Sequence, residues 1–405
     1  MMEVRKRRRV GSKKSTVLNG SSQSSDSSGS THSSVWCYAA TAFVVFIQTV
    51  LLIFIFSPSL IRPEIFSPME PPQFQGALAF NDDLETMTAR MFGDKFIGPE
   101  SLVTSGDSLY TGTYDHGVIR TDLQSNEVHE FPSLGDGICG NPSLEKTCGR
   151  PLGLRIREQN LYVIDAYFGL FKYDLANISA PAVQLFEDVV FGNDIAIASS
   201  GLIYYTDSSR RWERRNFMHL IFEATSDGIV REFNESSMEH RTLSTTLSFA
   251  NGIEISPQED YLVVCETSRA RISRYWLKGP SRGSWDFFAH NLPGLPDNIR
   301  LSPRGTYWVG FAAVRTGSYS QLYEYGNSPF LRNLALKLLT WMPSLLDLIP
   351  SAGMIVELDT NGSIIRSLQD VTGNTVPSVS EVEEVGSVLY LGSYSHPYLT
   401  KLTFH

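Results

Sequence analysis

Four short segments of the chain place a carboxylate or a carboxamide at a turn that leads into a predicted strand. The segments are GPES (98–101), FGND (191–194), FANG (249–252) and LPDNIR (295–300). Their oxygen-bearing side chains belong to Glu100, Asn193, Asn251 and Asp297, with Asn298 adjacent. Oxygen ligands of this kind suit a hard divalent cation such as Ca²⁺, which takes about six to eight of them, waters included. They are the wrong set for zinc, which prefers histidine and cysteine ligands.

Each segment taken alone also has an ordinary structural explanation, because Asn-Gly, Asn-Asp and Asp-Asn pairs are common turn formers. A shared metal site requires a fold that carries all four turns to one point. In a propeller the innermost strand of each blade lines a central channel, so equivalent turns from different blades converge on the axis. The four segments therefore predict an axial site if the chain forms a propeller.

A phrase that recurs six times predicts that fold. Each copy opens with β-branched and aromatic residues alternating at period two, and most copies end in a second short apolar strand. Such a unit is typical of an antiparallel hairpin with one buried face. The copies begin at Leu109, Leu161, Ile203, Tyr261, Thr306 and Val388. Most of the intervals suit the strands of one blade, so the sequence predicts an all-β, six-bladed β-propeller.

The propeller is predicted to cover residues 82–405, with two helical departures. Residues 82–93 are expected to form a short helix that leads into the first blade. The long interval before the last copy contains residues 329–350, whose apolar side chains recur at helical spacing between Pro329 and Pro343. This helical insertion has three roles open to it: to cap the channel mouth, to lie on a membrane, or to fill a gap between blades.

The N-terminal region predicts a membrane anchor. Residues 1–34 form a basic, serine-rich tail, and residues 35–61 contain no charged side chain. About 20 apolar residues suffice to cross a bilayer as a helix, and the basic tail and the lack of a small-residue cleavage site argue against a cleaved signal peptide. The Lys and Arg before the span predict a type II protein of the plasma membrane or an endomembrane, with its C-terminal domain luminal or extracellular. Residues 62–81 follow as a Pro-rich spacer.

Charge divides the chain at the same place. The tail carries seven basic and two acidic side chains, whereas the whole chain has a net charge of −9. The tail is therefore suited to contact with anionic lipid. The acidic remainder is a poor partner for nucleic acid.

Cysteines and glycosylation sequons agree with an ectodomain in an oxidising compartment. Cys139 and Cys148 flank a polar loop of a length that a disulfide can close, and Cys265 lies in an apolar strand as a small buried hydrophobe. Candidate glycan sites are Asn177, Asn234 and Asn361. Asn19 also opens a sequon, but on the cytoplasmic side it is expected to remain unmodified.

Several motifs together resemble the strictosidine synthase-like family: CGRPLGLRI, FGNDIAI, YYTDSSRRW, FANGIEISP, ETSRARI and LPDNIR. The resemblance covers nearly everything from about residue 58 onward, and it implies a six-bladed propeller. The family's relatives include the paraoxonases and the gluconolactonase-type lactonases, which hold a calcium ion in the channel, so the resemblance also implies a calcium site. Glu100, Asn193, Asn251 and the pair Asp297–Asn298 fall on the positions of those calcium ligands.

The chain departs from its relatives at the catalytic positions. The glutamate with which the plant alkaloid synthases condense an amine with an aldehyde falls on Ser380, and Glu381 is one place later, on the opposite face of a strand. Condensation of that type is therefore not expected. The paired histidines of the paraoxonases fall on Leu152 and Ala166, so that general base is absent too.

A second departure concerns a structural calcium of the relatives. Ser101 stands where they have an acid at this second ion, although Asp194 remains. Other polar residues have structural explanations. His116 and His396 are predicted as surface turn residues and Asp207 as a turn cap. Glu266 is predicted to hydrogen-bond a neighbouring blade. No G-x-S-x-G nucleophile motif follows a strand.

Two functions from different classes follow. The first is a membrane-anchored hydrolase of the arylesterase or lactonase type, in which the channel cation polarises the carbonyl of a small ester or lactone and water attacks. Its general base is not identified by the sequence. The second is a non-catalytic propeller that acts as a binding or adhesion platform for a protein partner, with the metal only joining the blades.

Overall fold

A computed structural model describes residues 29–137, 139–316, 325–348 and 351–404. Most of the predicted basic tail lies outside these residues. The chain divides into two compact units, Met1–Pro58 and Ser59–His405. In the first unit, helix α1 (Gly29–Phe56) contains a stretch, Trp36–Phe56, that is long and apolar enough to cross a membrane. The helix ends at Phe56 rather than at residue 61 because Pro58 lacks an N–H donor and disfavours helical backbone at the residue before it.

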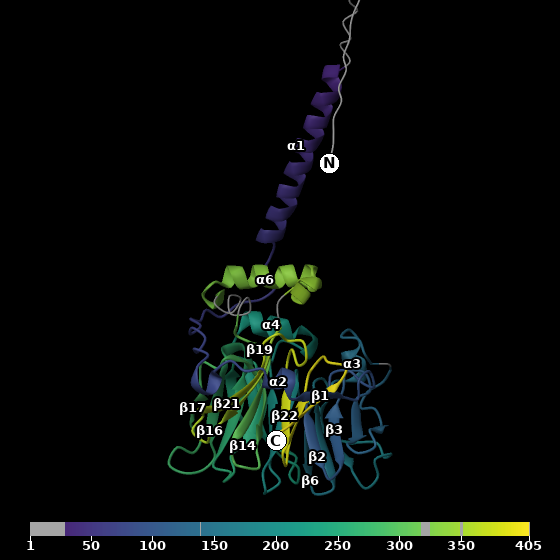
Figure 1. The fold of residues 1–405 in the computed structure, drawn as a ribbon, viewed down its shortest axis with the longest axis vertical. Helices are drawn as coiled ribbons and strands as arrows, with labels where there is room; N and C mark the ends of the chain where they lie inside the picture. The colour runs from purple at the N-terminus through teal and green to yellow at the C-terminus, as the bar shows by residue number, and fades with distance from the viewer. Residues whose placement is uncertain (1–28, 138, 317–324, 349–350, 405) are drawn as a thin grey trace, which may run out of the picture. The chain divides into compact units, whose positions relative to one another are not determined.

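The second unit is a six-bladed β-propeller, as predicted (Figure 1). Within the described residues, every blade is a four-stranded antiparallel sheet. Blade 1 consists of β2 (Leu102–Ser105), β3 (Ser108–Gly112), β4 (Val118–Asp122) and β5 (Val128–Glu130). Blade 2 consists of β6 (Pro151–Arg157), β7 (Asn160–Asp165), β8 (Gly169–Asp174) and β9 (Val183–Phe186). Blade 3 consists of β10 (Gly192–Ile197), β11 (Ile203–Asp207), β12 (Gly228–Asn234) and β13 (Glu239–Leu247).

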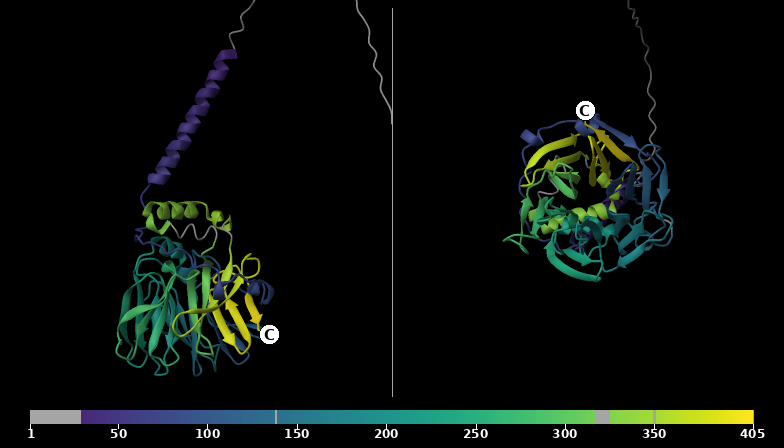
Figure 2. Two further views of the ribbon diagram at one scale, coloured as in Figure 1. Left: turned by 60° about the vertical axis from the view of Figure 1, so that its left-hand side comes forward. Right: turned by 90° about the horizontal axis from the view of Figure 1, so that it is seen from below.

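The remaining blades complete the ring (Figure 2). Blade 4 consists of β14 (Ala250–Ile255), β15 (Tyr261–Glu266), β16 (Arg271–Trp276) and β17 (Trp285–Ala289). Blade 5 consists of β18 (Gly294–Leu301), β19 (Tyr307–Val314), β20 (Gly353–Leu358) and β21 (Ile364–Asp370). Blade 6 consists of β22 (Glu381–Val385), β23 (Val388–Gly392), β24 (Leu399–Thr403) and β1 (Thr88–Met91).

Strand β1 closes the ring, and it corrects the helix predicted over 82–93. Only α2 (Asp83–Thr86) is helical there, and β1 pairs antiparallel with β24 from Thr88 opposite Leu402. The edge of β24 would otherwise expose unpaired backbone groups. Pairing between the two ends of the unit therefore overrides the local preference of this segment.

The repeated phrase marks strand two of every blade and, in the four copies that are hairpins, strand three as well. In blade 3 the predicted hairpin is wrong, because η2 (Arg214–Asn216) and α4 (Phe217–Glu223) intervene between β11 and β12. In blade 5, η4 (Tyr325–Asn327), α6 (Pro329–Trp341) and η5 (Pro343–Leu348) intervene between β19 and β20. The last group is the predicted helical insertion. Helices α4 and α6 pack together through Phe222 and Leu336, with Ile61 between them.

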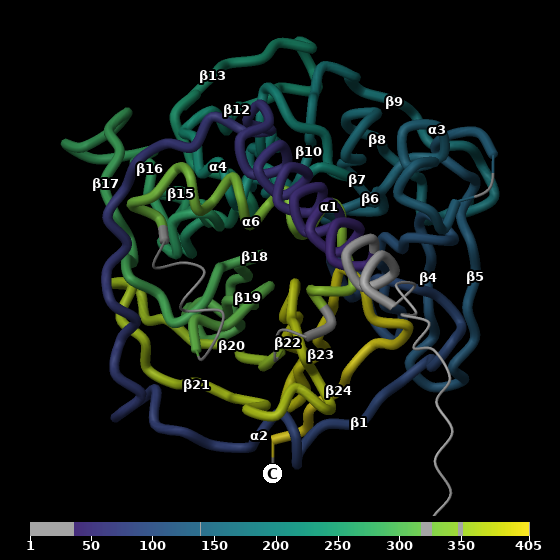
Figure 3. Tube along the Cα trace, turned by 90° about the horizontal axis from the view of Figure 1, so that it is seen from above, coloured from purple at the N-terminus to yellow at the C-terminus, as the bar shows by residue number. Residues whose placement is uncertain are grey.

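A short helix, η1 (Gly76–Leu78), precedes β1, and two others, α3 (Glu145–Cys148) and η3 (Thr267–Arg269), occupy connections between strands. Apolar side chains fill the spaces between neighbouring blades. Between blades 4 and 5, for example, Val263 of β15 packs in one cluster with Ile299 and Val309. Strands β2, β6, β10, β14, β18 and β22 are the innermost of their blades, and each lies beside the innermost strands of the adjacent blades around the axis (Figure 3).

Candidate axial site

The innermost strands carry the predicted ligands at β-bulges rather than at turns before the strands. The register of β10 against β11 shifts between Gly192 and Ile195, and that of β14 against β15 shifts between Ala250 and Ile253. Asn193 and Asn251 lie in these two irregular stretches. Bulges interrupt the alternation of a strand and re-aim side chains, and they occur often near functional sites.

A third bulge in β18, between Pro296 and Ile299, contains Asp297 and Asn298. Close approach of the blades also depends on glycine here. A Cβ atom at Gly252 would lie 2.5 Å from the Cα atom of Asn298, so a larger residue would push β14 and β18 apart. Glu100 differs from the others, since it lies just before β2 and its backbone N–H donates to Gly112.

Four of the five predicted ligands meet in one cavity of about 390 Å³. Glu100, Asn193, Asn251 and Asp297 come from blades 1, 3, 4 and 5, and all four are buried. Asn298 is buried as well but does not line the cavity. The wall is mainly apolar, with Leu152, Phe191, Phe217, Met218, Phe249 and Leu295 among its residues.

Several oxygens at this site have no hydrogen-bond partner among the residues that the structure describes. They are Glu100 Oε2, Asn193 Oδ1, Asn251 Oδ1 and Asn298 Oδ1. The amide of Asn251 is oriented by its Nδ2, which donates to Asp297 Oδ1 at 2.7 Å and to Thr267 Oγ1 at 3.0 Å. Its carbonyl oxygen is thereby left free. Buried acceptors without a donor are costly, and a cation among them would remove that cost.

The electrostatics of the site point the same way. Burial raises the pKa of Glu100 to about 6, against the opposing effect of Arg150. Burial and then the charge of Glu100 raise the pKa of Asp297 well above its ordinary value. Two buried carboxylates that repel each other, surrounded by neutral carboxamide oxygens, fit a divalent oxygen-seeking ion such as Ca²⁺. No cluster of three or more His, Cys, Asp or Glu side chains suited to a metal occurs in the part of the chain that is described.

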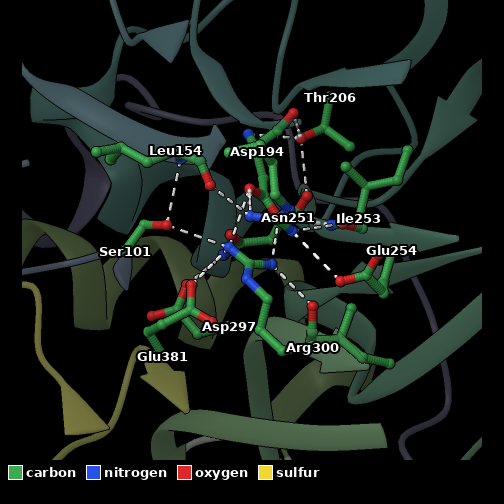
Figure 4. Close-up of polar contacts among 12 residues, drawn as sticks. Ser101, Leu154, Asp194, Thr206, Asn251, Ile253, Glu254, Asp297, Arg300 and Glu381 are labelled. Carbon is green, nitrogen blue, oxygen red and sulfur yellow. Dashed lines mark hydrogen bonds and ion pairs between the residues drawn. The ribbon is translucent and has the colours of Figure 1, made fainter. Parts of the chain in front are cut away.

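Directly behind these ligands lies an ion-pair network centred on Arg300 (Figure 4). The guanidinium donates to both oxygens of Asp194, at 2.8 and 3.1 Å, and to Ser101 Oγ at 3.2 Å. Its Nη2 also lies 2.5 Å from Glu381 Oε2. The position where the resemblance implies a second calcium is therefore filled by the cation of Arg300. Ser101 fits there because a hydroxyl accepts from the guanidinium without adding another negative charge.

The position of the synthase glutamate carries no acid into the cavity. Strand β22 begins at Glu381 and pairs with β23 in regular register from there, so Ser380 lies just before the strand. Ser380 Oγ donates to the backbone oxygen of Glu100 at 2.6 Å. Glu381 is engaged with Arg300 and is not a cavity residue.

His396 is not a surface residue, and that prediction was wrong. Its side chain is buried, lines the cavity, and places Nε2 3.4 Å from Ser378 Oγ. Burial, with a smaller effect of Arg90, lowers the pKa of His396 to about 4, so the imidazole is neutral near pH 7. His116 behaves as predicted, since it is half-exposed beside Glu130.

Sequence reasoning also missed an insertion that lines the cavity. Arg214, Phe217, Met218 and Ile221, from η2 and α4, all contribute to the wall. The position of these residues and of His396 between the second and third strands of a blade was a signal that the sequence offered. In a four-stranded antiparallel meander, the connection between strands two and three lies at the same end of the blade as the start of strand one. Residues in this connection therefore belong at the mouth of the channel, whether the connection is an insertion, as for Arg214, or a short hairpin turn, as for His396.

Other predicted residues have structural partners. Asp207 accepts from the backbone N–H groups of Phe191 and Val190, which confirms its capping role. Glu266 pairs with Arg271 of its own blade rather than with a neighbouring blade. Its carboxylate is not on the cavity wall, and Cys265 is buried as expected.

The predicted disulfide is present, and the sequon asparagines lie on the surface. Cys139 and Cys148 form a disulfide with their Cα atoms 5.6 Å apart. The three sequon asparagines, Asn177, Asn234 and Asn361, are exposed. Whether they carry glycans stays a prediction.

Fold and site together define a six-bladed propeller whose innermost strands deliver oxygen ligands to a mainly apolar axial cavity. The strictosidine synthase family model matches residues 193–280. Adipocyte plasma membrane-associated protein from Gallus gallus is 40% identical over 351 residues, which cover 84% of this chain and 84% of that protein. Protein strictosidine synthase-like 2 from Arabidopsis thaliana is 34% identical over 326 residues, covering 75% of this chain and 85% of that protein. The chain belongs to the strictosidine synthase-like family.

Solved structures share the fold at low identity. A gluconolactonase from Xanthomonas campestris matches with a TM-score of 0.52 at 15% identity, covering 86% of this chain and 99% of its own. Regucalcin from Agrobacterium tumefaciens, described as a calcium-binding protein, matches with a TM-score of 0.50 at 15% identity, covering 77% and 92%. These likenesses show the propeller fold.

Proposed function

We propose that the chain is a membrane-anchored carboxylic-ester hydrolase of the arylesterase or lactonase type, with Ca²⁺ at the axial site. One observation carries the proposal: unpartnered oxygens from blades 1, 3 and 4 face a buried, mainly apolar cavity large enough for a small ester. The likeness to a gluconolactonase and a calcium-binding regucalcin supports it.

The ligands would be Glu100, Asn193, Asn251 and Asp297, with the amide oxygen of Asn298 close behind. When bound, a divalent cation polarises an ester carbonyl and stabilises the charge that develops on its oxygen. The protein's own part is to hold its oxygens in place. The bond from Asn251 Nδ2 to Asp297 Oδ1 does this for two of the ligands.

His396 supplies the proton acceptor that the sequence left unidentified. Among the described residues that line the cavity it has the only imidazole, and its low pKa keeps it neutral near pH 7. Together with Ser378 Oγ, 3.4 Å from its Nε2, it would receive a proton from a water that attacks the ester. The apolar wall favours an aryl or alkyl group over a sugar.

The anchor follows from the N-terminal helix. Trp36–Phe56 would cross the membrane once, and the basic residues before it would keep the tail in the cytoplasm. The propeller, with its disulfide, would then lie in the lumen or outside the cell.

A second function is a non-catalytic platform for a protein partner, with the cation only joining the blades. The apolar side chains of Leu152 and Ala166 favour it, because they occupy the positions at which the resemblance implies a histidine pair. Condensation of an amine with an aldehyde is not supported, since Glu381 is held by Arg300.

One experiment separates the two functions. Hydrolysis of phenyl acetate by the full chain would be measured with calcium and after chelation, alongside thermal stability. The hydrolase predicts turnover that needs calcium and is lost in the double variant Asn251→Ala, Asp297→Ala. Loss of stability on chelation without any turnover to lose would favour the platform, and turnover that survives chelation and both substitutions would rule out the metal mechanism.

A further inference from the structure

The blade 3 insertion presents one continuous face to the cavity. Its lining residues are Arg214, Phe217, Met218 and Ile221, and their spacing of three, one and three residues is the spacing of a single helical face. Figure 1 shows α4 at the end of the propeller where α6 also lies. One short segment therefore supplies both apolar contact surface and a positive charge to the same wall.

Arg214 is distinctive because of that charge. Among the described residues that line the cavity it is the only Lys or Arg, and the carboxylates there are Glu100 and Asp297. Arg214 lowers the pKa of both acids, so the positive charge of its guanidinium acts on two of the predicted ligands. A cation and an apolar face next to an axial metal site are suited to a ligand with one anionic end and an apolar body.

An ion pair with Glu145 holds the Arg214 guanidinium in place. Its Nη1 lies 2.7 Å from Glu145 Oε1, and Glu145 Oε2 accepts from the hydroxyl of Tyr167 at 2.6 Å. Glu145 begins α3, and the disulfide of Cys148 ends that helix. A guanidinium has five N–H donors, so this single ion pair leaves donors available to a ligand. The Arg214 side chain is only 12% exposed, which strengthens charge-assisted hydrogen bonds.

We infer that the cavity binds an apolar monocarboxylate, with Arg214 pairing to the carboxylate and the α4 face of Phe217, Met218 and Ile221 packing against the apolar body. Recognition of a carboxylate does not depend on catalysis. The further statement that this carboxylate is the acid released by ester hydrolysis rests on the proposed function. In that case Arg214 would hold the carboxylate product, and free acid would compete with the substrate.

Binding of 4-phenylbutyrate tests the inference, with 4-phenylbutan-1-ol as the neutral probe of similar shape. The full chain in phosphatidylcholine nanodiscs with calcium would be titrated with each compound. The carboxylate is expected to bind at least about tenfold more tightly than the alcohol, in line with the strength of charge-assisted hydrogen bonds. Arg214→Gln should reduce that preference to within about twofold, while binding of the alcohol changes little.

Two further variants make the result specific. Arg215→Gln is the matched control, because Arg215 is the next residue, is 38% exposed, pairs with Glu213 and is not on the cavity wall; it should keep the full preference. Arg214→Lys keeps the charge but loses the planar fork, and should give an intermediate preference. If Arg214→Gln does not fold, the carboxylate preference of Arg214→Lys is the result that tests the inference.

Three results would overturn the inference: equal binding of the two probes by the natural chain, a preference that persists in Arg214→Gln, or a loss in Arg215→Gln as large as in Arg214→Gln. None of these requires turnover. A carboxylate preference without phenyl acetate hydrolysis would therefore sink the proposed function and keep this inference. Hydrolysis without the preference would do the reverse.

Discussion

Asp194 and Arg300, from the innermost strands of blades 3 and 5, form a two-pronged ion pair beside the axis, with N–O distances of 2.8 and 3.1 Å. The Asp194 side chain is fully buried and that of Arg300 is 6% exposed. Asp194 directly follows Asn193, whose own side chain lines the cavity. The bulge in β10 thus lets two consecutive residues serve different centres: Asn193 the axial cavity and Asp194 the ion pair.

Arg300→Met should therefore destabilise the propeller strongly. It leaves Asp194 and Glu381 buried without their cation, and removal of one partner of a buried pair typically costs about 3–5 kcal/mol. The measurement is the free energy of unfolding in denaturant. Arg241→Met is the matched control, since Arg241 is 54% exposed in its pair with Glu232 and should cost about 1 kcal/mol or less. Equal costs for the two variants would show that the buried network contributes no more than a surface pair.

Calcium should stabilise the protein more at pH 7.5 than at pH 5. Without the ion, the raised pKa values of Glu100 and Asp297 mean that the folded state takes up protons that the unfolded chain does not. Stability of the calcium-free protein therefore falls as pH rises through about 6, where Glu100 becomes charged. A bound cation offsets that loss at high pH and competes with protons at low pH.

The check is the change in Tm on adding calcium, measured at both pH values. In Glu100→Gln, one of the two charges is gone, so the difference between the two pH values should shrink. A calcium-induced shift that is the same at pH 5 and pH 7.5 would contradict this account of the site.

His396→Gln should lower kcat for phenyl acetate about a hundredfold or more, which is the usual size of a lost general base. Because His396 is not among the predicted ligands, the calcium-induced change in Tm should stay the same. His116→Gln, at an exposed turn, should leave both quantities unchanged. Full activity in His396→Gln would remove this residue from the mechanism.

The proposed orientation predicts glycans on Asn177, Asn234 and Asn361, whose side chains are exposed on the propeller, and none on Asn19. Treatment of the protein from cultured animal cells with peptide N-glycosidase should shift its apparent mass, and the shift should become smaller as each asparagine is replaced by Gln. Modification at Asn19 in place of the other three would reverse the orientation.

The sequence by itself determined the architecture and four of the residues that line the axial cavity. Alternation of β-branched and aromatic residues at period two is a local property of each strand, and six copies of it specify six blades whatever the details of their connections. Glu100, Asn193, Asn251 and Asp297 could be chosen in the same way, because a repeat places equivalent positions at one axis. The stretch Trp36–Phe56 likewise shows its helical, apolar character without any partner.

Only the tertiary structure decided which residues share the cavity with those ligands. His396 and Arg214 lie in connections between the second and third strands of their blades, so their surroundings depend on how blades 6 and 3 meet the axis, which local pattern does not encode. The pairing of β1 with β24 joins segments from opposite ends of the propeller. The ion pair of Arg300 with Asp194 depends on two bulges in different blades. Each of these contacts is made between positions far apart in the chain, and its energy appears only once the ring has closed.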